Sequence, residues 1–285
     1  MLCFQNTILP PFIKRAISIL SKKGRFIIGK LFSPATLGFY FRARSLNTYI
    51  TQYTSNSLMS VLLPAFSKVQ DDIVRFKKIV FKSYHMINLM AFFLTGLFFV
   101  VGDHLILFLF GEKWQASIPL FRLIILTAYG LPLSSILVNI LSASGNSKGF
   151  LKLEVIKKVF FGLALGFGFI WGIEGYLIAN IIAFALAVYV NIIFAGKQLK
   201  SGQWWFIRIT LPYLVLTALV AVFSHKILGL ISLNHLLSLS IGSLLFTIVF
   251  VTVAYLINLQ GLRLLVIEID ELGLIKKLKY KPKRN

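Results

Sequence analysis

Long apolar segments alternate with short polar, mostly basic segments along most of this chain. Six apolar segments are long enough to cross a hydrocarbon layer of roughly 30 Å as helices. They comprise residues 86–101, 118–143, 159–173, 176–195, 209–223 and 236–259. Backbone polar groups in lipid must bond within their own segment, so each span is expected to be helical. The pattern predicts an all-α, polytopic transmembrane helix bundle.

Composition excludes the main soluble classes. Hydrophobic residues make up 58% of the 285 residues and charged residues 14%, whereas a soluble domain carries about a quarter charged residues. Cys3 is the only cysteine, which excludes an intramolecular disulfide and a cysteine metal cluster. The net charge of +21 lies between apolar runs instead of clustering on one folded face, so we expect no nucleic-acid partner.

Basic residues fall in alternate loops, which predicts the topology. Nineteen basic residues fall in one set of segments: five in 68–82, four in 148–158, three in 197–208 and seven in the tail after Gly261. The intervening loops hold only two, Lys113 and Lys226. Because basic loops stay in the cytoplasm, we expect the C-terminus inside. The outer loops are then 103–116, 172–175 and 224–235, and the glycines of 172–175 permit a tight turn.

Residues 35–66 form a more polar helix. Arg44, Thr48, Thr51 and Ser55 recur at steps of three and four, which places them on one helical face. One interpretation is that this face lines a water-filled cavity; the other is an amphipathic helix on the membrane surface. We favour the cavity because such a stripe in lipid would be costly.

Three regions follow from these patterns. Residues 1–25 are an irregular basic leader without a complete span, and residues 26–260 are the transmembrane bundle. Residues 261–285 are a cytoplasmic tail, in which 262–279 read as an amphipathic helix at the inner membrane surface.

Catalytic chemistry is not indicated by these residues. The carboxylates lie in loops or at membrane edges, and the histidines lack the spacing of a metal pair. His85 is interpreted as a polar cap near the inner end of a span, with a proton relay as the alternative. We therefore expect no enzyme activity, no catalytic residue, no metal and no cofactor.

Positive charge near the polar helix is more informative. Lys30, Arg42 and Arg44 flank or enter it, and Arg122 lies early in the span 118–143, where it either faces the bundle or extends to the outer interface. Arg42 and Arg44 are two residues apart and cannot share one helical face. The planar donor fork of arginine suits phosphate oxygens, so we expect an anionic substrate.

Several short runs of this sequence are typical of a known family. Residues 28–43 read IGKLFSPATLGFYFRA and resemble the run "IGK-FSPA-LGYY-RA" of Wzx-type polysaccharide flippases, which belong to the multidrug/oligosaccharidyl-lipid/polysaccharide exporter superfamily. Further similar runs follow in the family's order at 63–75, 111–120 and 151–158. Beyond residue 160 the similarity is mainly one of hydropathy.

The resemblance implies transport of undecaprenyl-pyrophosphate-linked oligosaccharide across the bacterial inner membrane for polysaccharide or lipopolysaccharide synthesis, with membrane lipids as the surroundings. It implies a fold of two six-helix lobes around a cationic cavity, often with two added helices. This chain would supply the second lobe and the added pair, about eight helices. Arg42 lies in the matched motif and, with Arg44, Lys30 and Arg122, would bind pyrophosphate; Thr48, Thr51 and Ser55 would line the cavity.

The start of the chain departs from the family pattern. Where the family has a complete helix and a preceding lobe, residues 1–25 have broken hydropathy. We interpret this as N-terminal truncation, with a missing N-terminal lobe or self-association completing the cavity. The alternatives are an inert partial transporter and a membrane-embedded enzyme of envelope polysaccharide synthesis. The enzyme is disfavoured because it would need large outer loops, and those here are about a dozen residues long.

Overall fold

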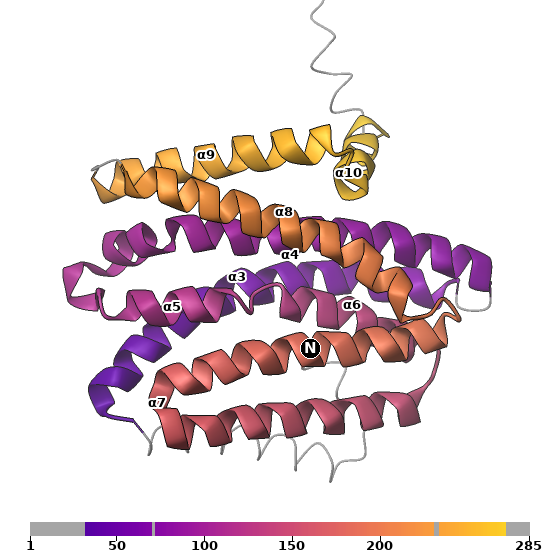
Figure 1. The fold of residues 1–285 in the computed structure, drawn as a ribbon. Helices are drawn as coiled ribbons and strands as arrows, with labels where there is room; N and C mark the ends of the chain where they lie inside the picture. The colour runs from indigo at the N-terminus through magenta and orange to yellow at the C-terminus, as the bar shows by residue number, and fades with distance from the viewer. Residues whose placement is uncertain (1–31, 70–71, 231–233, 272–285) are drawn as a thin grey trace, which may run out of the picture.

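The computed structural model describes residues 32–69, 72–230 and 234–271, and within these ranges the chain is helical with no strand. Figure 1 shows long helices stacked side by side, which confirms the all-α bundle. The helices are α3 (Pro34–Ser67), α4 (Ile73–Phe110), η1 (Glu112–Trp114), α5 (Ser117–Ile125), α6 (Gly130–Ala143), α7 (Ser147–Gln198), α8 (Gln203–Gly229), α9 (His235–Leu256) and α10 (Gln260–Glu271). The predicted leader lies outside the described residues.

Each predicted span corresponds to a helix or part of one. Among the described residues, five stretches are long and apolar enough to cross a membrane: α4, the combined α5–α6, α7, α8 and α9. The 52-residue α7 is two arms joined at a kink, where Gly172 has φ +70° and Trp171 also leaves helical geometry. The two arms are the spans predicted before and after the turn at 172–175.

The span predicted over 118–143 is confirmed as one membrane-length stretch, but it consists of two helices instead of one. α5 ends at Ile125, a turn follows, and α6 begins at Gly130. Pro132, the third residue of α6, has no N–H to donate to a carbonyl four residues earlier, which favours a break one turn before it. The two short helices still lie end to end as one membrane-length unit.

Polar side chains set the starts of two long helices. The Asp72 carboxylate accepts hydrogen bonds from the backbone N–H groups of Val74 and Arg75, each at 3.0 Å, and so caps α4. The Asn146 side chain caps α7 by accepting from the Gly149 N–H at 2.9 Å. At its other end, α4 stops at Gly111, whose φ of +84° favours glycine.

α4 is the central helix of the bundle. It packs against α8 and α9 on one side and against α3, α5 and α6 on the other, while the α7 arms form the far side (Figure 1). Gly96 of α4 permits the close packing, because a Cβ there would lie 2.6 Å from the Phe246 ring and 2.7 Å from Thr217. A second apolar core joins the first half of α3 to α5 and to the start of the second α7 arm.

A buried hydrogen-bond chain attaches α10 to the bundle. The Gly261 N–H donates to the Tyr213 hydroxyl at 2.8 Å, and this hydroxyl lies 2.7 Å from His85 Nδ1. His85 was expected to be a polar cap near a helix end; instead it lies inside α4, is 6% exposed and bonds to Tyr213. The predicted tail helix over 262–279 is described only as far as Glu271.

Candidate functional site

The first half of α3 carries Arg42, which lies in the run similar to the family, and Arg44, which lies just beyond it. Tyr40 and Ala43 are buried in the second core and anchor this part of α3 against α5 and the second α7 arm. Phe39 meets Trp114 edge to face, with the ring centroids 5.8 Å apart. These contacts place Arg42 and Arg44 at the end of the bundle that carries η1 and the α7 kink, where the outer loops were predicted.

Arg42 is held by two aromatic rings. Its Cζ atom lies 4.4 Å from the centroid of the Phe110 ring and 4.6 Å from that of Trp114. The two rings are 6.4 Å apart and inclined at 64°, so they form a corner into which the guanidinium fits. A guanidinium over an aromatic face is attracted by the negative potential of the ring. The half-buried Arg42 is therefore positioned by aromatic contacts.

Arg44 points to a different set of partners. Its Nη1 donates to the Tyr40 hydroxyl at 2.6 Å, and Tyr40 in turn meets the Tyr176 ring edge to face at 6.3 Å. The side chain is exposed, in contrast to that of Arg42. The expectation that Arg42 and Arg44 occupy different faces is confirmed by these separate partners.

Arg122 differs from both because its charge is neutralised. It forms a two-pronged ion pair with Asp103, with Nε donating to Oδ1 at 3.0 Å and Nη2 bonding Oδ2. Within the described ranges no carboxylate forms such a pair with Arg42 or Arg44. Asp103 was predicted to lie in a loop or at a membrane edge; it lies in the last third of α4 and binds a side chain of α5.

The polar stripe of α3 bonds largely to its own helix. The Thr48 hydroxyl donates to the Arg44 carbonyl at 2.9 Å and the Thr51 hydroxyl to the Asn47 carbonyl at 2.8 Å. Thr51 is 6% exposed, so this part of the stripe packs against protein. Ser55 lies in α3, but its side chain is outside the described atoms, and Lys30 lies outside the described residues. The structure thus brings Arg42 and Arg44 together at one end, with the threonines one to two turns further along.

A buried ion pair in α7 was missed from the sequence. Lys157 is 7% exposed, and its ammonium contacts the Glu154 carboxylate. Both residues were assigned to a cytoplasmic loop or membrane edge, but α7 begins at Ser147 and includes them. Their i, i+3 spacing was the available signal, since oppositely charged residues at this spacing are neighbours on a helix.

The histidines assigned to the outer loops also have partners far along the chain. His104 Nδ1 at the end of α4 lies 3.4 Å from His235 Nδ1 at the start of α9, and His235 Nε2 lies 3.1 Å from Glu112. Within the described part of the chain, no group of three or more such side chains could hold a metal ion.

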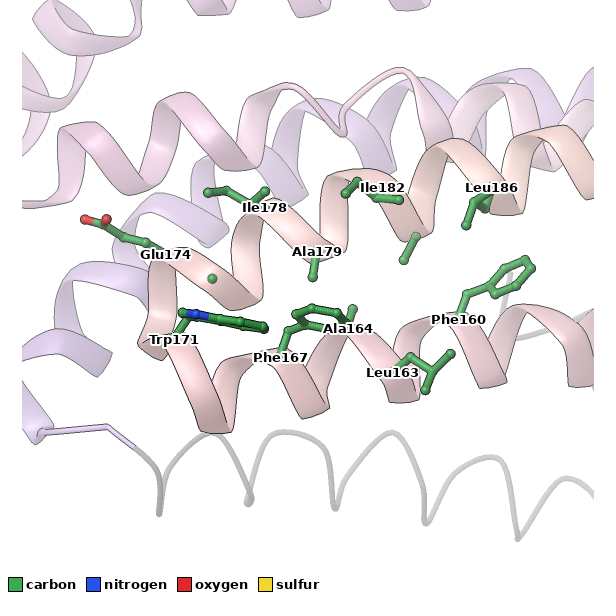
Figure 2. A pocket seen from close by; sticks show the side chains of 12 residues that line it. Phe160, Leu163, Ala164, Phe167, Trp171, Glu174, Ile178, Ala179, Ile182 and Leu186 are labelled. Atoms are coloured by element: carbon green, nitrogen blue, oxygen red, sulfur yellow. The ribbon is translucent and has the colours of Figure 1, made fainter.

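An apolar groove of about 570 Å³ runs between the two arms of α7 (Figure 2). Phe167 and Trp171 stack along one side, and Ile178 and Ile182 line the other. Glu174, the one charged residue in its lining, is negative. The groove suits hydrocarbon, and its lining provides no cation for a phosphate group.

Comparison with known proteins supports the resemblance read from the sequence. Residues 12–119 match the profile of a family described as "Polysaccharide biosynthesis protein". The chain is 28% identical over 177 residues to an uncharacterized membrane protein in the cps region of Klebsiella pneumoniae, covering 59% of this chain and 36% of that protein. It is 27% identical over 205 residues to the lipopolysaccharide biosynthesis protein WzxC of Escherichia coli K12, covering 67% of this chain and 41% of that protein.

The apolar helices and these matches indicate a multi-pass membrane protein that is similar to proteins of polysaccharide and lipopolysaccharide biosynthesis. The similarity to Wzx-type polysaccharide flippases is confirmed. The chain spans about two fifths of the length of the relatives it matches. No solved structure matches it.

Proposed function

We propose that this chain acts in the export of a lipid-linked oligosaccharide, as one lobe of a Wzx-type flippase, with undecaprenyl pyrophosphate as the carrier. The observation that carries the proposal is the pair of arginines, Arg42 and Arg44, on a polar helix inside the segment that matches the family. Neither charge is neutralised by a described carboxylate, so both guanidinium groups retain positive charge for an anionic headgroup.

The mechanism in this proposal involves no bond making. Lobes that rock around a central site expose it alternately to each side of the membrane. α3 is too polar to be counted among the membrane-spanning candidates, and its exposed Arg44 and Gln52 suit a water-filled cavity. Because the chain spans about two fifths of its relatives, a second lobe or a second copy would form the opposite wall.

The basic loops support a position in the bacterial inner membrane with the C-terminus in the cytoplasm. The basic segments 68–82, 148–158 and 197–208 surround the starts of α4, α7 and α8, at the end of each helix away from η1 and the α7 kink. The Arg42 site would then lie toward the outer leaflet.

Complementation of a flippase-deficient strain tests the proposal. We expect export to be restored when the chain is joined to the first half of a relative such as WzxC. Restoration by the chain alone would mean that two copies complete the path. If neither restores export despite normal membrane levels, the chain is an inert fragment or carries a different substrate, and the proposal fails for this oligosaccharide.

A further inference from the structure

We propose that Phe110 and Trp114 are positioning residues for the anionic site: they hold Arg42 by the face of its guanidinium and present the edge to one phosphate group of a lipid pyrophosphate. This inference rests on the proposed function, because it assumes that Arg42 meets such a headgroup. It adds two residues that lie far from Arg42 in sequence and carry no charge themselves.

The corner is built by the turn that ends α4. Gly111 has φ +84°, its N–H donates to the Leu107 carbonyl at 2.8 Å, and its carbonyl accepts from the Trp114 N–H at 3.1 Å. This tight turn places Trp114 beside Phe110, the last residue of α4. Phe39 of α3 also meets the Trp114 indole in an edge-to-face contact, which restricts the position of the indole further.

The aromatic contacts of Arg42 leave its hydrogen-bond donors available. Its Cζ atom lies over both rings, which attract the positive charge, whereas the N–H donors lie in the guanidinium plane and can bind acceptors at its edge. Within the described residues no acceptor bonds these donors, so a phosphate can bind them while the aromatic contacts remain. The rings also limit the rotamers of a long side chain, so less conformational entropy is lost when the ligand binds.

A lysine in this position would not serve equally well. Its ammonium is a compact point charge without a plane, so it cannot stack by one surface and donate in a fork from another. The aromatic corner therefore explains why an arginine, rather than any cation, is suited to residue 42. It also favours ligands with paired, coplanar acceptor oxygens, as in a phosphate group.

Binding of a polyprenyl pyrophosphate to the purified full chain in lipid nanodiscs tests this inference. We expect Trp114→Leu and Phe110→Leu each to raise the dissociation constant about fivefold, in line with the usual range for a cation–π contact. Trp114→Phe keeps a ring and should change it less than twofold. Trp171→Leu is the matched control, because Trp171 stacks on Phe167 in the α7 groove instead.

A double-mutant cycle separates positioning from a general structural role. In an Arg42→Gln background, Trp114→Leu should cause no further loss, because the residue acts through Arg42. A full fivefold loss in that background, or an equal loss in Trp171→Leu, would overturn the inference. Unchanged binding by Trp114→Leu would also overturn the inference, but it would not contradict the proposed function. Absence of probe binding by the unmodified chain, both alone and joined to the first half of a relative such as WzxC, would overturn the proposed function and this inference together.

Discussion

Arg122 of α5 is joined to Asp103 of α4 by a two-pronged ion pair, which ties the two helices together near the end of the bundle that carries Arg42. This ion pair distinguishes Arg122 from the other two arginines that the sequence analysis treated as substrate ligands. Arg122 has a structural partner, whereas Arg42 and Arg44 contact aromatic rings and a hydroxyl group. Charge alone gave these arginines similar standing as substrate ligands, and their partners now distinguish them.

Removing the Asp103–Arg122 pair should therefore affect stability more than transport. The Arg122 side chain is 44% exposed, so we expect Arg122→Gln to lower the free energy of unfolding by about 1 kcal/mol or less. Thermal unfolding in detergent measures this change. Export by the chain joined to an upstream lobe should remain; its loss at normal protein levels would return Arg122 to the list of substrate ligands.

The Lys157–Glu154 pair should be more sensitive, because both side chains are nearly buried. Glu154→Gln leaves a buried ammonium without its counter-charge, and we expect a loss of roughly 3–5 kcal/mol in stability. Replacing both residues, as in Glu154→Gln with Lys157→Met, should cost less than the single change. Thermal unfolding of the two variants measures this difference, and a larger loss in the double variant than in Glu154→Gln would contradict the prediction.

The attachment of α10 depends on Gly261. A Cβ there would lie 2.6 Å from the Tyr213 hydroxyl and 2.8 Å from the His85 carbonyl, so Gly261→Ala should detach α10 from α4 and α8. Hydrogen exchange of residues 260–271 should then become faster. Gly229→Ala is a suitable control, since nothing lies within 4 Å of its added Cβ. Unchanged exchange in Gly261→Ala would mean that the helix shifts without losing its contact.

The kink in α7 should tolerate glycine better than any other residue at position 172. Its φ of +70° is unfavourable for a residue with a side chain, so Gly172→Ala should cost about 1 kcal/mol or more in stability. Gly162→Ala, also without neighbours near its added Cβ but inside the first arm, should be neutral or stabilising. Equal effects of the two changes on unfolding would contradict a conformational role for Gly172.

The sequence predicted those parts of the structure that depend on local patterns. Apolar runs located the spans, and the glycines near residue 172 located the turn, because helix length and backbone freedom are properties of short segments. The polar helix over 35–66 also agrees closely with α3. The break between α5 and α6 was missed because Pro132 lies in a segment whose hydropathy is uninterrupted.

Partners far apart in sequence could not be predicted in this way. Arg42 was recognised through a motif, but its contacts with Phe110 and Trp114 depend on how α3 packs against the end of α4. The approach of His104 to His235 joins residues 131 positions apart for the same reason. Such pairings arise from tertiary packing, which no short sequence window contains.

The most direct test of the account is export by the chain joined to the first half of a relative, with Arg42→Glu compared with Lys226→Glu in a flippase-deficient strain. Lys226 is exposed near the end of α8 and serves as a charge-matched control. The account predicts that Arg42→Glu abolishes export while Lys226→Glu retains it, at equal membrane levels. Normal export by Arg42→Glu would contradict the assignment of the anionic site to α3.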